Sequence, residues 1–247
     1  MNTKVIIPNS LTMGNLLGGS FVCWMAASGY DLSSGTVAIV WLGAMICDLF
    51  DGLIARQLGV DGPMGVQLDS LSDLVTGGLA PAFVAYRLIS DSDYSTVVFS
   101  EISPLVRILP WAIVVAAAYR LARHNVSMAN GAKSNYFEGL PAPATGIFWM
   151  GMIVWIGGIK TPQEMCAILI VAGMGLLLLP VFMVIKRKFF TLKEWGDDPV
   201  IDKTRMIFIA LSVSVAAVVA IAWHNVFAAA PLCVLLYSCF AFLLAPK

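Results

Sequence analysis

Four aspartates form two pairs within one short stretch of the chain: Asp48 with Asp51, and Asp69 with Asp73. At 3.6 residues per helical turn, the members of each pair lie about 60° and about 40° apart, so each pair projects from one face of a helix. The connection from Gln57 to Met64 is short enough for the two helices to pack antiparallel. We therefore expect four carboxylates to converge at one end of a helix pair.

This convergence predicts a metal site. Each charged side chain inside a membrane helix costs about 2.5 to 3.5 kcal/mol, so the four aspartates represent roughly 10 kcal/mol that packing does not explain. Clustered carboxylates repel one another unless a cation lies between them. Hard oxygen ligands suit Mg²⁺ or Mn²⁺, and the number of carboxylates allows one ion or two.

The residues around the aspartates predict the kind of ligand. Gly52, Ala55 and Gly65 are small and leave the backbone beside the carboxylates unshielded. Arg56 follows Gly52 by one turn and supplies a fixed positive charge that suits a phosphate. Together with a metal, these residues describe a site for a diphosphate that carries a lipid tail.

The elements that position this site are membrane helices. The chain is 59% hydrophobic and only 12% charged, and its mean hydropathy is +0.85; soluble domains average about 25% charged residues. A spanning helix needs about 20 mostly apolar residues. We therefore expect an all-α integral membrane protein, a polytopic bundle of about eight transmembrane helices, at residues 8–28, 34–57, 66–88, 104–123, 141–159, 164–185, 207–226 and 229–245.

The basic residues predict the orientation. With the N-terminus inside, the cytoplasmic connections hold 12 of the 15 Lys and Arg residues, and the opposite side holds Arg87, Arg107 and Lys160. Cytoplasmic loops are enriched in Lys and Arg. We therefore expect both termini and the aspartate site on the cytoplasmic side of the cell (inner) membrane.

Residues 1–247 are expected to form a single membrane domain, since the chain has no long linker and no internal repeat. Five cysteines lie in apolar stretches without metal-ligand or disulfide spacing. The sequence has no nucleic-acid-binding module, so we expect the lipid bilayer, and no nucleic acid, as a partner.

Three classes of protein compete for these features. A cation transporter also keeps aspartates in its helices, but usually near the middle of the membrane in broken helices. A structural protein with buried ion pairs would leave four acids facing one nearby base. A metal-dependent enzyme that acts on phosphates accounts for both the excess carboxylate and Arg56, and is favoured.

The positions just described resemble the signature of the CDP-alcohol phosphatidyltransferase family, and they match it at Asp48, Asp51, Gly52, Ala55, Arg56, Gly65, Asp69 and Asp73. The catalytic motif thus spans residues 48–73. The resemblance implies transfer of a phosphatidyl group from a CDP-activated lipid to an alcohol, with release of CMP. It further implies that Asp48, Asp51 and Asp69 bind metal, that Asp73 is the general base and also touches metal, and that the protein is a homodimer.

Three further motifs resemble the phosphatidylserine synthase branch: I-P-N-S-L-T from Ile7, R-L-A-R-H-N-V from Arg120, and F-E-G-L-P-A-P-A from Phe137. The branch implies CDP-diacylglycerol as donor and L-serine as acceptor. Glycerol 3-phosphate and inositol phosphate are the alternative acceptors within the family.

Each secondary motif has two interpretations. Asn9 and Thr12 either cap a helix start or, with Gly52, Ala55, Arg56 and Gly65, bind the CDP-lipid. Arg120 and Arg123 either anchor the topology or bind the serine carboxylate, because a guanidinium recognises carboxylates in a bidentate manner. Glu138 is either a solvated loop acid or the partner of the serine ammonium group.

Overall fold

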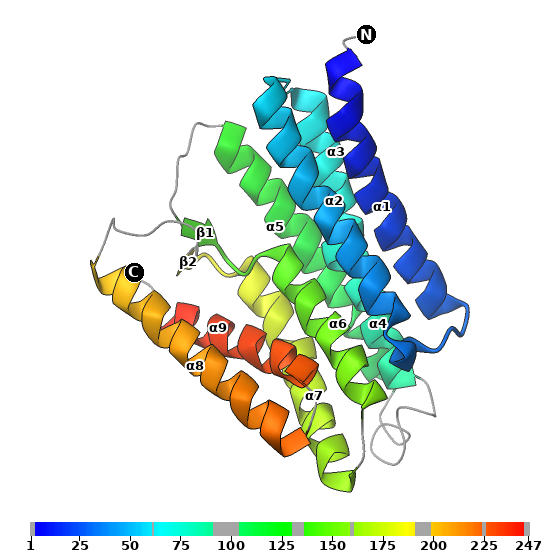
Figure 1. The fold of residues 1–247 in the computed structure, drawn as a ribbon, viewed down its shortest axis with the longest axis vertical. Helices are drawn as coiled ribbons and strands as arrows, with labels where there is room; N and C mark the ends of the chain where they lie inside the picture. The colour runs from blue at the N-terminus through cyan, green and yellow to red at the C-terminus, as the bar shows by residue number, and fades with distance from the viewer. Residues whose placement is uncertain are drawn as a thin grey trace.

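Long apolar stretches punctuated by Gly and Pro fold into a bundle of helices in the computed structural model (Figure 1). The structure describes residues 3–60, 62–90, 104–129, 136–158, 161–190, 199–223 and 226–244. The α-helices are α1 (Ile6–Ala27), α2 (Thr36–Leu58), α3 (Pro63–Leu74), α4 (Ala80–Ser90), α5 (Trp111–Ala129), α6 (Ala142–Gly157), α7 (Pro162–Val184), α8 (Pro199–Trp223) and α9 (Ala229–Leu244). In the described part of the chain, a π-helical segment, η3 (Val75–Leu79), and four 3₁₀ turns complete the helical elements: η1 (Thr3–Val5), η2 (Leu32–Ser34), η4 (Pro104–Ile108) and η5 (Val226–Ala228).

Each expected apolar segment overlaps a helix, and the prediction of a helical membrane protein is confirmed. Four stretches within the described residues are long and apolar enough to cross a membrane: Thr36–Leu58, Gln163–Val184, Asp202–Ala222 and Val226–Leu243. Ala142–Gly157 is a shorter apolar helix. The total of eight spans stays a prediction.

The helix expected at 104–123 is displaced along the chain. Residues 104–108 form the 3₁₀ turn η4, and α5 begins only after Pro110, at Trp111. The helix then continues six residues beyond Arg123 to Ala129. The sequence prediction stopped at the basic residues because they end the apolar stretch, whereas helical hydrogen bonding continues through polar residues.

One continuous helical unit carries the second aspartate pair. Residues expected as one span, 66–88, fold as α3, η3 and α4 in succession, with Pro81 just after the π turn. A proline inside a helix removes one backbone donor, and π turns accommodate such interruptions. The unit therefore carries Asp69 and Asp73 into the bundle and changes register directly after them.

A small sheet departs from the expected all-α fold. Strands β1 (Tyr136–Glu138) and β2 (Lys188–Phe190) pair antiparallel, with Phe137 opposite Phe189. Strands of three residues lie in connections and carry too few residues for a period-2 pattern, so the sequence did not indicate them.

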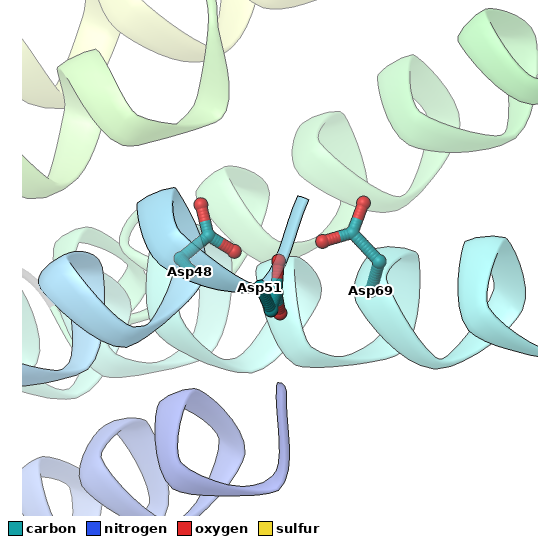
Figure 2. A group of neighbouring side chains, drawn as sticks. All are labelled: Asp48, Asp51 and Asp69. Carbon is teal, nitrogen blue, oxygen red and sulfur yellow. The ribbon is translucent and has the colours of Figure 1, made fainter. Parts of the chain in front are cut away.

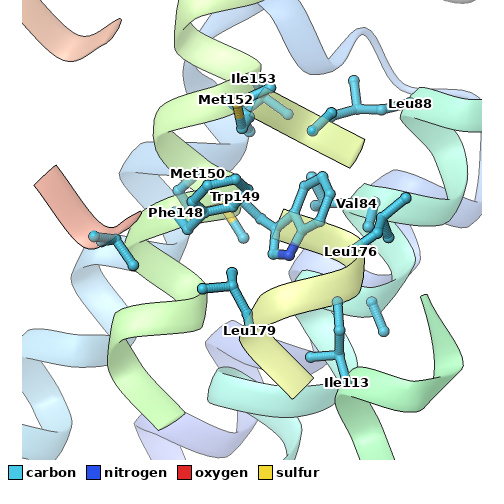
Figure 3. Packing of buried hydrophobic residues seen from close by; sticks show 14 of the residues in the cluster. Val84, Leu88, Ile113, Phe148, Trp149, Met150, Met152, Ile153, Leu176 and Leu179 are labelled. Atoms are coloured by element: carbon cyan, nitrogen blue, oxygen red, sulfur yellow. The ribbon is translucent and has the colours of Figure 1, made fainter. Parts of the chain in front are cut away.

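The core of the bundle surrounds α6 (Figure 3). Phe148, Trp149, Met152 and Ile153 are completely buried. Side chains from α4, α5 and α7 pack around them, among them Val84, Leu88, Ile113, Leu176 and Leu179. A helix that is apolar on all sides belongs in the centre of a bundle. The aspartate pairs belong to other elements, α2 and α3.

Candidate active site

The two aspartate pairs are presented by α2 and α3, which are joined by a tight connection. Gly59 ends α2 in the left-handed conformation, with φ of 61°, and its N–H bonds to the carbonyls of Ala55 and Arg56. Glycine adopts this conformation without steric cost, which makes it a common helix terminator. Pro63 then occupies the first turn of α3, where its missing N–H is not needed.

The carboxyl groups of Asp48, Asp51 and Asp69 converge as the helical spacing predicted. One oxygen of each lies within 4.8 Å of the other two. Figure 2 shows Asp48 and Asp69 directed toward one another, with Asp51 between them. Asp51 is buried and the other two are half-buried, so the cluster faces the interior of the site rather than bulk solvent.

Asp73 lies beside this group of three. Its carboxyl group is within hydrogen-bonding contact of the Asp48 carboxyl group, and it interacts electrostatically with Asp69. On its other side it interacts with the positive charge of Arg120 on α5. Asp73 therefore links the aspartate cluster with a buried guanidinium.

Helix α1 holds the two carboxylate-bearing helices in place. It packs against both α2 and α3, and it contacts each more extensively than they contact one another. Gly18 of α1 allows this approach, since a Cβ atom there would lie 2.7 Å from the Ala44 Cβ. Small residues at helix interfaces permit such close backbone packing.

Polar side chains of α1 reach the carboxylates directly. Thr12 donates a hydrogen bond of 2.5 Å to Asp51, and Asn15 Nδ2 donates one of 2.8 Å to Asp48. Both donors are buried. Asn15 was not predicted from the sequence, where its signal is an amide in an apolar helix, one turn after Thr12.

A cavity of about 420 Å³ opens between these helices. Its lining includes every residue that the sequence predicted for the metal and the CDP-lipid: Asn9, Thr12, Asp48, Asp51, Gly52, Ala55, Arg56, Gly65, Asp69 and Asp73. Pro8, Leu49, Val60, Gly62 and Val66 complete it and were not singled out by their sequence.

Two glycines of this lining face open space. A Cβ atom built on Gly52 or on Gly65 would meet no atom within 4 Å. Packing within the chain therefore does not require glycine at either position, whereas a ligand lying against the backbone would. Beside them, the exposed Arg56 is oriented by a 3.0 Å hydrogen bond from its Nε to the Gly52 carbonyl.

The three residues predicted for the acceptor separate in the structure. Arg120 is buried and interacts with Asp73, and its Nε has no hydrogen-bond partner among the described residues. Arg123 instead donates to the carbonyls of Val184 and Glu138 at 2.7 and 2.8 Å. None of the three belongs to the lining of the cavity, but Arg120 faces Asp73, which does. Lys133, the third basic residue of this region, lies outside the described residues.

The donor set fits a hard divalent cation. The three grouped carboxylates supply only oxygen ligands, and Mg²⁺ and Mn²⁺ favour such ligands. Among the described residues, Arg56 is the only Lys or Arg in the cavity lining. The acidic cluster therefore has the composition of a cation site rather than of a buried ion-pair network.

Comparison with known proteins agrees with this geometry. The family model described as CDP-alcohol phosphatidyltransferase matches residues 5–185. The chain belongs to the CDP-alcohol phosphatidyltransferase family. The match runs from α1 to the end of α7, so α8 and α9 lie beyond the part that defines the family.

Several curated proteins are similar to part of this chain. The CDP-diacylglycerol–serine O-phosphatidyltransferase of Saccharomyces cerevisiae is 36% identical over 44% of this chain and 37% of its own length. The enzyme of that name from Mycobacterium leprae is 30% identical over 60% of this chain and 46% of its own. The archaetidylserine synthase of Methanothermobacter thermautotrophicus is 32% identical over 60% of this chain and 59% of its own. The matches thus cover between about two fifths and three fifths of these relatives.

Proposed function

We propose that this protein is a phosphatidylserine synthase, which transfers the phosphatidyl group of CDP-diacylglycerol to L-serine and releases CMP. The observation that carries the proposal is that the aspartates, Arg56 and two glycines facing open space line the same cavity. A diphosphate needs cationic groups and close approach to the backbone, and this cavity supplies both. Membership of the family and the names of the relatives support the reaction and the acceptor.

Asp48, Asp51, Asp69 and Asp73 would hold Mg²⁺ or Mn²⁺, and we propose two ions. When bound, such ions neutralise the negative charge of a diphosphate. The remaining groups of the donor subsite belong to the chain itself. Arg56 would face the diphosphate with a guanidinium oriented by the Gly52 carbonyl, and Gly52, Ala55 and Gly65 would leave room for it. Asn9 and Thr12 line the same cavity.

Proton transfer falls to Asp73 in this mechanism. Its carboxylate accepts the proton of the serine hydroxyl, the hydroxyl oxygen forms a bond to the lipid-side phosphorus, and the bond from that phosphorus to the CMP oxygen breaks. A positioned general base typically contributes about 10² to 10⁴ in rate. Asp73 is suited to this role because it lines the cavity and also faces Arg120.

Arg120 is our choice for the serine carboxylate. A buried guanidinium whose Nε has no hydrogen-bond partner among the described residues can bind an anionic ligand. A carboxylate bound there would place the serine hydroxyl near Asp73, the proposed general base. Arg123 and Glu138 were predicted for the same purpose. Their contacts favour a supporting role instead, because they tie α5 to β1 and to the end of α7.

The reaction requires a membrane boundary. CDP and serine are water-soluble groups, whereas the acyl chains of the donor stay in lipid. We propose eight spans in the cell (inner) membrane, with both termini and the cavity on the cytoplasmic side, on the basis of the Lys and Arg distribution. We further propose a homodimer, which the family resemblance implies; native mass spectrometry of detergent-solubilised protein tests this.

The decisive experiment measures CMP release and the lipid product from purified protein with CDP-diacylglycerol. L-Serine, glycerol 3-phosphate and inositol phosphate are compared as acceptors. Phosphatidylserine as the main product supports the proposal. Transfer only to a phosphorylated acceptor would reassign the branch, and no release of CMP with any acceptor would contradict a transferase and favour a cation transporter.

A further inference from the structure

The carbonyl of Thr76 in η3 is left without a partner inside its own helix. The N–H of Ala80, which an α-helix would direct to Thr76, bonds instead to the carbonyl of Val75. In a π-helical turn the donor for Thr76 would be residue 81, and Pro81 has no N–H. The indole Nε1 of Trp41 on α2 supplies the missing hydrogen bond at 2.9 Å.

The hydroxyl of the same threonine reaches α1. Thr76 Oγ1 lies 2.7 Å from Asn15 Oδ1, closer than it lies to the carbonyls of Ser72 and Asn15, at 3.1 and 3.3 Å. All three partners are acceptors, and a hydroxyl has one proton to donate. The shortest contact therefore identifies the side-chain oxygen of Asn15 as the acceptor.

Asn15 connects Thr76 with the aspartate cluster. It is completely buried, and its Nδ2 donates to Asp48 Oδ1 at 2.8 Å. An ionised carboxylate only accepts hydrogen bonds, so Asp48 requires the amide nitrogen on its side. The amide oxygen must then face Thr76, where the hydroxyl donates to it. Each group in the series thus fixes the orientation of the next.

The series begins and ends on α2. Trp41 and Asp48 are seven residues apart, about two helical turns, and lie on the same side of that helix. The connection between them runs through η3 and α1. Because Thr76 follows Asp73 by three residues, the same π turn directly continues the helix that carries Asp73.

Close packing holds the relay in position. A Cβ atom on Gly19 would lie 2.7 Å from Thr76 Oγ1, and one on Gly146 would lie 2.1 Å from Trp41 Cζ2. Both glycines therefore admit neighbours that any larger residue would displace. Thr76 and Asn15 are fully buried and Trp41 nearly so, so water does not compete for these hydrogen bonds.

We propose that Trp41, Thr76 and Asn15 form a positioning relay that orients Asp48 for a divalent cation and couples its placement to the π turn after Asp73. The inference rests on the metal site of the proposed function but not on its acceptor. The relay does not touch substrate. Groups behind metal ligands typically change metal affinity by about 10- to 100-fold when they are removed.

Mn²⁺ binding by the purified full chain tests the relay. The loss of the EPR signal of free Mn²⁺ measures the dissociation constant without donor or acceptor. Thr76→Val removes the hydroxyl at nearly constant shape and should raise the Mn²⁺ Kd about 10-fold or more. Thr76→Ser keeps a hydroxyl and should remain within about threefold of the wild type.

Thr145→Val is the matched control. Thr145 is also completely buried, and its hydroxyl bonds to the Met183 sulfur, away from the cavity lining. This variant should lower the melting temperature without changing the Mn²⁺ Kd. Trp41→Phe removes the first hydrogen bond of the relay and serves as the second variant in case Thr76→Val does not fold. It should raise the Mn²⁺ Kd by about threefold or more.

Two outcomes would overturn the inference. If Thr76→Val and Trp41→Phe lose stability as Thr145→Val does but bind Mn²⁺ like the wild type, these residues serve packing alone. If the wild type itself binds no Mn²⁺, the metal site fails and the relay with it. Failure of serine as acceptor would affect neither result.

Discussion

The Glu138 carboxylate lies 3.5 Å from Arg123 Nε, so two residues that the sequence offered for serine binding neutralise one another. Arg123 also donates to the carbonyls of Val184 and Glu138, and its guanidinium lies 5.7 Å from the centre of the Tyr119 ring. The end of α7 and strand β1 are thereby tied to α5. This arrangement distinguishes Arg123 from Arg120, which lies one turn earlier and faces Asp73.

Arg120→Ala and Arg123→Ala should therefore have different effects. Loss of Arg120 should raise the serine KM about 10-fold or more and change the donor KM less, since one charged hydrogen bond contributes about 1.5 to 3 kcal/mol. Loss of Arg123 should lower the melting temperature and leave the serine KM near that of the wild type. Steady-state kinetics and thermal unfolding in the same detergent measure both. A raised serine KM in Arg123→Ala alone would reverse the assignment.

Asp73→Asn should preserve shape but remove the proton acceptor. We expect kcat to fall by about 10² to 10⁴ while CDP-diacylglycerol still binds. Turnover at saturating serine and donor, together with a donor-binding assay, separates the two properties. Normal turnover at saturation with lost donor binding would show that Asp73 acts as a metal or substrate ligand instead.

Chelation should abolish activity, and added Mg²⁺ or Mn²⁺ should restore it, because the carboxylates of Asp48, Asp51 and Asp69 converge and repel one another without a cation between them. Asp51→Asn should weaken Mn²⁺ and donor binding together. Asp31→Asn is the control, since Asp31 caps η2 in the connection between α1 and α2 and lies outside the cavity lining. Full activity in excess chelator would exclude a metal requirement.

The distribution of basic residues predicts which connections face the outside of the cell. In a variant otherwise free of cysteine, Ser92→Cys should react with a membrane-impermeant thiol reagent on intact cells, and Ser134→Cys should not. Both positions lie outside the described residues, so labelling supplies what the structure does not describe. The opposite labelling pattern would invert the topology and place the cavity away from cytosolic serine.

Gly146→Ala should destabilise the protein by about 1 to 3 kcal/mol, because its Cβ would lie 2.1 Å from the Trp41 ring. Gly173→Ala in α7 is the control substitution, because a Cβ atom at Gly173 would meet no atom within 4 Å. This second change should be neutral or stabilising by about 0.5 to 1 kcal/mol. Thermal unfolding of both variants checks the difference, and equal stability would show that Trp41 has room to move.

The sequence alone determined the helices and the aspartates of the site. Helical periodicity acts over three or four residues, so the spacing of Asp48 and Asp51 was enough to place both on one face. Apolar length was enough to place a helix in each expected segment, but not to give the bounds of α5. The family signature between residues 48 and 73 is equally local. These properties follow from near neighbours along the chain, which a sequence shows directly.

Only the tertiary structure decided how the two pairs meet. The short connection between α2 and α3 predicts that these helices pack against each other, whereas α1 joins them and supplies Asn15 to Asp48. Arg120 and Arg123 could not be separated from the sequence, because their roles depend on Asp73, Glu138 and the end of α7. The Thr76 carbonyl in the π turn likewise accepts a hydrogen bond from Trp41, 35 residues away. Contacts between residues distant in sequence, together with the close packing that admits them, fixed these features.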